Sequence, residues 1–284
     1  MITKPNVKIN LGLNVLRKRE DGFHDLETLF VPYFDINDTL EIVVGDDFSR
    51  TSAAIFGKYA PEMIAQGISE DGKMMITIAR KEGVDWDPLK DLTSKAYYIL
   101  SEDFDLPPVK IYLEKNSPVG AGLGGGSADA AFALKMLNEL CDLQQTEQQL
   151  ASYAARLGSD CAFFVYNRPM IGEGRGEVLT EIEAGFMEGI LSEYDLQVLT
   201  PEGVAVSTKD AYGGIKPHLP EVPLREALTR PVDQWNGILV NDFEETVFAK
   251  YPELAAIKRS LYDSGATYAC MSGSGSALFA LYRK

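Results

Sequence analysis

The residues with the clearest chemical use lie in a glycine-rich stretch near the middle of the chain. Five glycines occur within the seven residues from Gly120 to Gly126, between an alternating apolar run and a run with helical spacing. Glycine costs roughly 0.5–1 kcal/mol more than alanine inside regular structure, so packing alone does not explain the cluster. Bare backbone N–H groups can approach an anion closely there, and the N-terminus of a following helix favours phosphate. The stretch therefore predicts a cradle for nucleotide phosphates.

Two familiar phosphate loops fit this stretch poorly. A Walker A loop ends in Gly-Lys-Ser or Gly-Lys-Thr, whereas here Ser127 follows the last glycine directly. The glycines match the dinucleotide fingerprint in form, but that motif also needs an acidic residue about 20 positions on, after a second strand. The acidic residues near that distance, Glu139 and Asp142, fall within or just after a helix-like run. A flexible linker is the remaining alternative, although linkers usually lack ordered elements on both sides.

The flanking patterns supply the elements that must position the loop. Apolar and polar residues alternate over 109–114, which is the period of a half-buried strand. Small and apolar residues recur with helical spacing over 130–141, and Ser127 is a candidate cap for that helix. The patterns also predict a strand over 74–79, helices over 92–100 and 148–157, and an apolar run over 161–165. Residues 46–92 are otherwise polar, mixed and hard to assign.

Further candidate residues stand outside the loop. A strand of period two at the N-terminus places Lys8 and Asn10 on one surface, about 7 Å apart; a solvent-facing strand is the alternative. The turn Asp21-Gly22 is followed by Phe23 and His24. Asp160 follows a helix that ends at Gly158, and taken alone it would cap the next element.

Composition limits the class of protein. The 284 residues carry 27 Lys and Arg against 42 Asp and Glu, a formal net charge of −15, which disfavours a nucleic-acid partner. The three cysteines form no Cys-x-x-Cys pair and only two histidines occur, so a disulfide framework or zinc site is not expected. The N-terminus lacks an apolar signal core, and no run approaches the roughly 20 apolar residues of a membrane span. We therefore expect a cytoplasmic protein with no membrane partner.

Three separated motifs resemble one kinase superfamily. They are Lys8-Ile9-Asn10-Leu11, the loop from Pro118 to Ala128, and Ser272-Gly273-Ser274-Gly275. Their order and spacing are similar to those of the galactokinase–homoserine kinase–mevalonate kinase–phosphomevalonate kinase (GHMP kinase) superfamily. Within it, three further segments resemble the family of 4-diphosphocytidyl-2-C-methyl-D-erythritol kinases: residues 19–28 with Asp-Gly-Phe-His, residues 158–164 and residues 172–176.

This resemblance implies an α+β fold of two lobes. The N-terminal ATP-binding lobe would be ribosomal protein S5 domain 2-like and span residues 1–165, and a ferredoxin-like C-terminal lobe would span 166–284. The implied reaction transfers the ATP γ-phosphate to the 2-hydroxyl of 4-diphosphocytidyl-2-C-methyl-D-erythritol, in the non-mevalonate (MEP) route to isoprenoid precursors. Mg²⁺ is expected with ATP, usually bound through its phosphates; Ser127 and Asp160 are candidate ligands, but none is assigned. A monomer or weak homodimer is expected.

The resemblance also implies roles for individual residues. Asp160 matches the catalytic base and Lys8 the catalytic lysine, while His24 matches the residue that reads cytidine, Phe23 its aromatic neighbour and Asn10 a residue of the same pocket. The expected ATP-binding residues are Lys115, Pro118, Val119, Gly120, Ala121, Gly122, Leu123, Gly124, Gly125, Gly126, Ser127 and Ala128.

Departures from the family pattern leave alternatives open. Asn6-Val7-Lys8 replaces Pro-Ala-Lys, Phe23 stands where tyrosine is common, and only Lys90-Asp91-Leu92 represents the Asp-Asn-Leu before the adenine-side helix. Ala121 replaces a common glycine and is expected to be tolerated if its φ is negative. The alternatives are another small-molecule kinase of the superfamily, acting on homoserine, mevalonate or a sugar, and a non-catalytic ligand sensor on the same fold.

Overall fold

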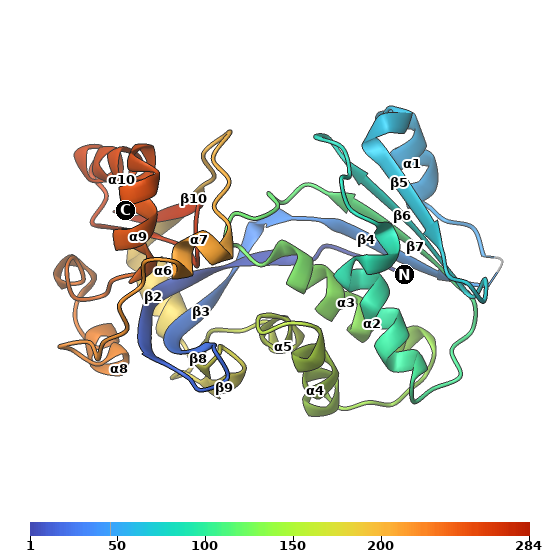
Figure 1. The fold of residues 1–284 in the computed structure, drawn as a ribbon, viewed down its shortest axis with the longest axis horizontal. Helices are drawn as coiled ribbons and strands as arrows, with labels where there is room; N and C mark the ends of the chain where they lie inside the picture. Colours follow the sequence, from blue (N-terminus) through green and yellow to red (C-terminus); the bar gives the residue numbers. More distant parts are fainter. Residues whose placement is uncertain (46) are drawn as a thin grey trace. The chain divides into compact units, whose positions relative to one another are not determined.

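The computed structural model describes residues 1–45 and 47–284, and its backbone contacts divide the chain into two compact units (Figure 1). Unit 1 comprises residues 1–7, 33–119 and 124–167, and unit 2 comprises 8–32, 120–123 and 168–284. The long strands β2 (Asn6–Lys18) and β3 (His24–Asn37) contribute residues to both units. The division at residue 165 stays a prediction, because the compact units are discontinuous along the chain.

Unit 1 is built on a five-stranded sheet with the order β1-β4-β7-β6-β5. The β6–β7 pair is parallel and the other pairs are antiparallel. The strands are β1 (Ile2–Thr3), β4 (Thr39–Val44), β5 (Ile64–Ile68), β6 (Met74–Arg80) and β7 (Val109–Lys115). The helices are α1 (Thr51–Lys58), α2 (Leu92–Ser101), α3 (Gly125–Leu140), α4 (Glu147–Leu157) and α5 (Cys161–Tyr166), with 3₁₀ turns at Pro61–Met63 and Pro88–Lys90. Helices α2 to α5 gather together within this unit (Figure 1).

Local sequence explains why these helices begin where they do. The Asp91 carboxylate accepts the backbone N–H of Thr93 at 2.8 Å and so caps α2. Thr146 and Gln149 form a reciprocal capping box at the start of α4. Four of the nine buried residues of α3 are alanines, which allow close approach to neighbouring elements. The strand expected over 109–114 and the helices expected over 92–100 and 148–157 are confirmed by β7, α2 and α4, and β6 confirms the strand over 74–79.

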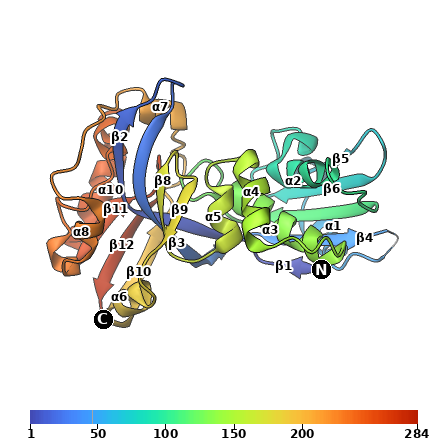
Figure 2. The same cartoon turned by 90° about the horizontal axis from the view of Figure 1, so that it is seen from below.

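Unit 2 contains two further sheets. One has the order β2-β3-β8-β9 and the other, fully antiparallel, has the order β10-β12-β11. Figure 2 shows β8 and β9 beside the β2–β3 hairpin. The additional strands are β8 (Met170–Gly174), β9 (Val178–Glu181), β10 (Tyr194–Leu199), β11 (Tyr268–Met271) and β12 (Leu278–Arg283). The helices are α6 (Phe186–Glu193), α7 (Thr208–Tyr212), α8 (Leu224–Leu228), α9 (Phe243–Lys250) and α10 (Pro252–Asp263), with a 3₁₀ turn at Val232–Gln234.

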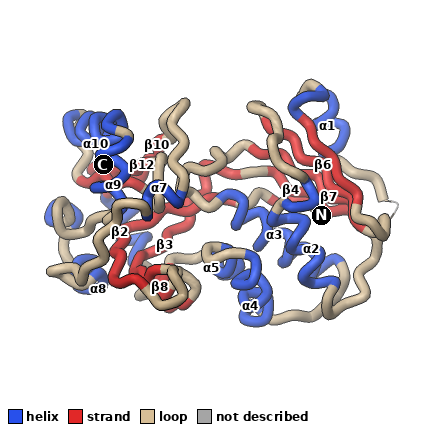
Figure 3. The backbone as a smooth tube through the Cα atoms, viewed as in Figure 1, coloured by secondary structure: helices blue, strands red, loops and turns tan. Residues whose placement is uncertain are grey.

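The core of unit 2 joins β2 to the C-terminal sheet. Its buried apolar members come from β2, the loop before α7, α7, α9, α10, β11 and β12, and they are Leu13, Val15, Val206, Ala211, Phe243, Val247, Leu254, Met271 and Leu278. Between β10 and α9 the chain is mostly loop with short helices (Figure 3). Among the described residues, no helix has the length and apolar character needed to cross a membrane.

Candidate active site

The glycine-rich loop alternates in backbone conformation. Gly120, Gly122 and Gly124 have φ values of +74°, +77° and +72°, whereas Ala121 and Leu123 are not in this left-handed region. Such alternation turns successive N–H groups toward one side and creates an anion-binding concavity. Ala121 does not have a positive φ, which meets the condition under which an alanine is expected to be tolerated there. The loop therefore has the backbone form that a phosphate cradle requires.

Helix α3 begins within the loop, earlier than the sequence predicts. Its first residue is Gly125 and its N-cap is Gly124, so Ser127 lies inside the first turn and the prediction that it caps the helix is wrong. The backbone bond from Ala128 N–H to the Gly124 carbonyl, at 2.9 Å, closes that turn. The preceding N–H groups lack partners within the helix, as at every helix N-terminus. This adds donors and a favourable dipole for an anion.

Lys8 is buried on β2 and anchored to the glycine-rich loop. Its ammonium donates to the Gly122 carbonyl at 2.8 Å and to Asn10 Oδ1, and its backbone N–H donates to the Leu123 carbonyl at 3.0 Å. Asn10 in turn donates to Thr28 Oγ1 at 3.1 Å. The alternative of a solvent-facing strand is wrong here, because Lys8 and Asn10 are each only 2% exposed.

A second glycine-rich loop, Ser272–Gly275, packs against the first within unit 2. A Cβ added to Gly122 would lie 2.3 Å from the Ser272 carbonyl oxygen, and one added to Gly273 would lie 2.8 Å from the Gly122 oxygen. The Ser272 hydroxyl accepts the Asn10 N–H at 3.2 Å and donates to the Gly122 carbonyl at 3.3 Å. The two separated sequence motifs therefore meet backbone to backbone, with Lys8 and Asn10 beside them.

Lys115 lies in a buried ionic network of unit 1. Its ammonium donates to Asp38 Oδ2, to Asp129 Oδ2 at 2.6 Å and to Ser117 Oγ at 3.3 Å. These contacts use its three N–H donors, and its side chain is 4% exposed. Burial alone lowers the pKa of Lys115, but the charges of Asp129 and Asp38 outweigh it and raise that pKa above the ordinary value. These contacts are those of a structural counter-charge, and the expected contact of Lys115 with ATP phosphates stays a prediction.

The Asp38 carboxylate organises the segment that leads into the loop. Its Oδ1 accepts the backbone N–H groups of Asn116 and Ser117 at 2.6 and 2.7 Å, and its Oδ2 accepts the Ser117 hydroxyl at 2.7 Å. A Cβ added to Gly125 would lie 2.4 Å from Ser117 Oγ. The network therefore lies directly against the first turn of α3.

Asp160 immediately precedes α5. It occupies the N-cap position, but its side chain makes no capping hydrogen bond, so the interpretation of Asp160 as a simple helix cap is wrong. In the next residue, burial raises the pKa of the Cys161 thiol to about 12, opposed by a side-chain hydrogen bond with Ser127. Residue 161 of α5 and Ser127 of α3 therefore meet within unit 1.

Phe23 and His24 stand where the β2–β3 hairpin turns into β3. The His24 ring stacks on Tyr212 of α7 with centroids 4.9 Å apart and an interplanar angle of 25°. Burial lowers the pKa of His24 below its ordinary value of 6.5, and the charge of Lys18 lowers it further. Phe23 is 55% exposed, and the guanidinium carbon of Arg175 lies 5.0 Å from its ring centroid. Phe23 thus leaves part of an aromatic ring accessible, and His24, the next residue in the chain, has a neutral imidazole.

Sequence reasoning did not identify several of these residues. Tyr212 lies in a loop-rich region with no motif signal, although its stacking on His24 is clear in the structure. Asp38 and Asp129 looked like ordinary acidic residues, and only their burial beside Lys115 reveals the network. A charged residue inside an alanine-rich helical run, as Asp129 is, was the one available signal.

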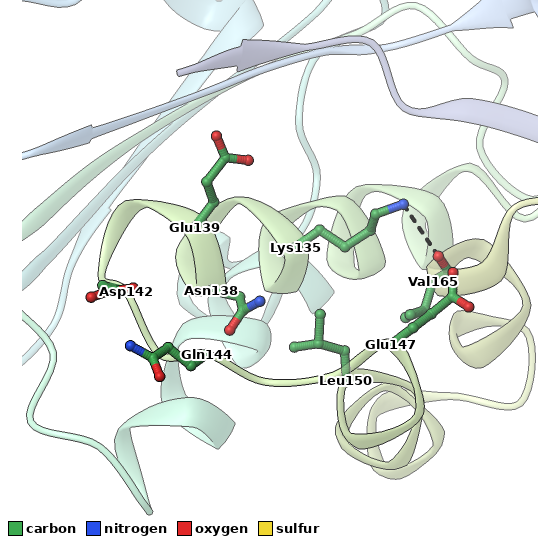
Figure 4. Close-up of a pocket in the computed structure, with 8 residues that line it drawn as sticks. All are labelled: Lys135, Asn138, Glu139, Asp142, Gln144, Glu147, Leu150 and Val165. Atoms are coloured by element: carbon green, nitrogen blue, oxygen red, sulfur yellow. Dashed lines mark hydrogen bonds between the residues drawn. The ribbon is translucent and has the colours of Figure 1, made fainter.

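A separate hollow of about 480 Å³ lies along α3 and α4 in unit 1 (Figure 4). Its lining is mainly polar, and the Lys135 ammonium crosses it to the Val165 carbonyl at 3.2 Å. None of the residues predicted for the site lines it. Among the described residues, no group of three or more His, Cys, Asp or Glu side chains is arranged to hold a metal ion.

Comparison with known families defines the class of protein. Residues 91–168 match the GHMP kinases N terminal domain, and residues 224–284 match the GHMP kinases C terminal. A solved homoserine kinase from Cytophaga hutchinsonii has the same fold, with a TM-score of 0.61, 17% identity and coverage of 98% of this chain and 85% of that one. The fold and the paired glycine-rich loops are those of a GHMP kinase.

Closer relatives define the family. The 4-diphosphocytidyl-2-C-methyl-D-erythritol kinase of Bacteroides fragilis is 45% identical over 99% of this chain and 92% of its own length. The Porphyromonas gingivalis enzyme of the same name is 41% identical over 100% and 93%. A crystal structure of 4-(cytidine 5′-diphospho)-2C-methyl-D-erythritol kinase has a TM-score of 0.71, with 28% identity and coverage of 99% and 90%. The chain belongs to the 4-diphosphocytidyl-2-C-methyl-D-erythritol kinase family, as its motifs predict.

Proposed function

We propose that this kinase transfers the γ-phosphate of ATP to the 2-hydroxyl of 4-diphosphocytidyl-2-C-methyl-D-erythritol, a step toward isoprenoid precursors in the MEP pathway. The observation that carries the proposal is similarity over nearly the full chain to relatives of that name. The accessible Phe23 ring and the neutral imidazole of His24 are groups that suit a pyrimidine, since an aromatic ring can stack on it and an imidazole can hydrogen-bond its edge.

The loop supports a role in holding nucleotide phosphates. Alternating backbone conformation over Gly120–Gly124 and the start of α3 at Gly125 offer N–H donors without a side-chain charge. We assign ATP binding to Pro118–Ala128. Lys115 supports this loop indirectly, through its contacts with Asp38 and Asp129. In the same scheme, residues 1–165 form the ATP-binding domain and 166–284 the C-terminal domain.

Lys8 and Asp160 carry the chemistry in this proposal. Phosphoryl transfer depends on positioning and charge stabilisation more than on covalent help. Asp160 accepts the proton of the attacking hydroxyl, and the Lys8 ammonium, fixed on the Gly122 carbonyl, stabilises charge on the transferred group. Mg²⁺, when bound with ATP, neutralises phosphate charge. The Ser127 hydroxyl and the Asp160 carboxylate are oxygen ligands of the kind it prefers.

A parallel substrate assay tests the function. We expect ADP release in a coupled assay with ATP, Mg²⁺ and 4-diphosphocytidyl-2-C-methyl-D-erythritol, and none with methylerythritol 4-phosphate, homoserine or mevalonate. Turnover with one of the other substrates would be consistent with the class of kinase but would refute the proposed substrate. ATP binding without any turnover would favour the ligand sensor.

The Asp160→Asn variant tests the proposed base. It preserves size and removes the proton acceptor, so kcat should fall by roughly 10²–10⁴ while ATP affinity measured by calorimetry stays within about threefold. An Asp160→Asn enzyme with normal kcat would remove Asp160 from the mechanism.

The remaining assignments concern the setting of the reaction. We propose a cytoplasmic enzyme, monomeric or weakly dimeric, that acts without a nucleic-acid or membrane partner. Its formal net charge of −15 supports the absence of a nucleic-acid partner. Light scattering during size-exclusion chromatography measures the oligomeric state directly.

A further inference from the structure

We infer that Asn241 is a positioning residue for Lys8, acting through the two glycine-rich loops of unit 2. The inference rests on the catalytic role proposed for Lys8. Asn241 lies between β10 and β11 in sequence, just before α9, and no motif in the sequence draws attention to it. Its side chain is buried, with 2% exposure, so it acts on other protein groups and not on a ligand from solvent.

Every polar group of the Asn241 side chain has a backbone partner. Its amide nitrogen donates to the Met271 carbonyl at 2.7 Å and to the Gly273 carbonyl at 2.8 Å. Its amide oxygen accepts the Phe243 N–H at 3.0 Å, which fixes the amide at the start of α9. One donor thus binds the end of β11 and the other binds the Ser272–Gly275 loop, so the two contacts flank Ser272.

That loop fixes the position of Gly122. No side chain fits between Gly273 and Gly122, because a Cβ at either position would approach the other loop within 3.0 Å. The Ser272 hydroxyl also donates to the Gly122 carbonyl at 3.3 Å. Close packing of this kind transmits displacements, since protein interiors are dense and poorly compressible. A shift of Gly273 therefore moves the Gly122 carbonyl.

The Gly122 carbonyl is in turn an acceptor for the Lys8 ammonium, at 2.8 Å. Asn241 is also connected to Lys8 through the backbone of β2, the strand that carries Lys8. Leu13 N–H donates to the Val240 carbonyl at 2.8 Å, and Asp242 N–H donates to the Leu13 carbonyl at 2.9 Å. The segment that carries Asn241 is thus attached to the same strand as Lys8. Asn241 is therefore connected to Lys8 in two ways: through the backbone hydrogen bonds to β2 and through the two packed glycine-rich loops.

A double-mutant cycle tests this connection. We expect Asn241→Ala to lower kcat by about 10- to 100-fold while KM for ATP changes less than about threefold, because a small misplacement of a catalytic group is costly. In a Lys8→Met background the same change should lower kcat by less than about threefold, since residues that act as one unit are not additive. Asn241→Asp, which retains the acceptor for Phe243 N–H, is the second variant should Asn241→Ala fold poorly.

Tyr268→Phe is the matched control. It removes another buried hydrogen bond from the same region, from the Tyr268 hydroxyl to the Leu239 carbonyl at 2.7 Å, without removing a bond to either glycine-rich loop. We expect it to lower the urea midpoint by less than Asn241→Ala, which removes three hydrogen bonds instead of one, and to leave kcat within about threefold in either background. An equal loss of kcat in Tyr268→Phe would mean that general destabilisation explains the effect and would overturn the inference.

A second readout separates this inference from the proposed function. The urea-midpoint shift caused by Asn241→Ala should be about half as large in the Lys8→Met background as in the wild type, because the two residues share one network. If the wild type shows no turnover, the proposed function fails and this stability cycle alone decides the inference. Additive effects of the two substitutions on the midpoint, or on kcat in an active enzyme, would refute it.

Discussion

Replacement of Lys115 by methionine should destabilise unit 1 strongly, because it removes the cation from a buried ionic network. The Lys115 ammonium faces two carboxylates, those of Asp38 and Asp129, whose side chains are 0% and 1% exposed. Methionine retains most of the apolar stem and removes only the charge and its donors. Breaking a buried pair from one side costs about 3–5 kcal/mol, since it leaves an uncompensated charge out of water.

The same substitution at an exposed ion pair provides the matched control. Lys58 pairs with Glu114, the neighbour of Lys115 on β7, at 2.5 Å, but the Lys58 side chain is 61% exposed. Exposed pairs contribute about 0.2–1 kcal/mol in double-mutant cycles. The free energy of unfolding should therefore fall several times more for Lys115→Met than for Lys58→Met.

Urea unfolding monitored by ¹⁹F NMR of fluorotryptophan measures both effects. The chain has two tryptophans: Trp86 lies in unit 1 and Trp235 in unit 2, so each unit has its own resonance. We expect Lys115→Met to shift the Trp86 transition, and Lys115→Met/Asp38→Asn to recover part of the loss because one of the two carboxylates that face the missing cation is neutralised. Equal effects of the two lysine substitutions, or no recovery in the double variant, would refute the reasoning.

Two further predictions concern the loop and the hairpin. Gly122→Ala should raise KM for ATP about tenfold or more and lower the urea midpoint, because its Cβ would lie 2.3 Å from the Ser272 oxygen. Gly120→Ala is the control for backbone strain and should have the smaller effect, because Gly120 has a similar positive φ but a Cβ there would meet nothing within 4 Å. His24 is held neutral by its lowered pKa, so KM for the cytidine-linked substrate should be constant above the ordinary histidine pKa of 6.5 and rise only as pH falls below that value. The titration of His24 can be followed by ¹H NMR because His218 is the only other histidine, and a KM that decreases in acid would contradict the neutral role.

The sequence predicted those parts of the fold and site that depend on local pattern. Alternation identified β7, a short apolar run identified β6, helical spacing identified α2 and α4, and glycine content identified the loop, because each signal follows from local sequence. The start of α3 was misplaced, since Ser127 has the chemistry of a cap but the left-handed Gly124 ends the loop first. The side-chain chemistry of Ser127 alone cannot show which residue is the N-cap when a nearby glycine can adopt the left-handed conformation.

Long-range contacts account for what the sequence could not predict. Lys8 and Gly122 are 114 residues apart in sequence, and Ser272 lies 150 residues beyond Gly122. Tyr212 has no spacing relation to His24, because the two come from different elements of unit 2. Such contacts depend on tertiary packing, which leaves no period in a single sequence.

The contacts of Lys115 bear on how the proposed site would hold an anionic nucleotide in an acidic chain. Its ammonium faces two carboxyl groups, those of Asp38 and Asp129, and burial raises the pKa of Asp129 well above its ordinary value, so Lys115 contributes little net positive potential to a ligand. In the proposed site the phosphates must then depend mainly on backbone N–H groups and on the N-terminus of α3, whose partial charges are fixed by the fold. Preorganised dipoles need no reorganisation when charge develops. The glycines, the buried ionic network and the Asn241 contacts thus have one effect in common. They hold the backbone rigidly, so that its N–H groups can stabilise phosphate charge in place of a positively charged side chain.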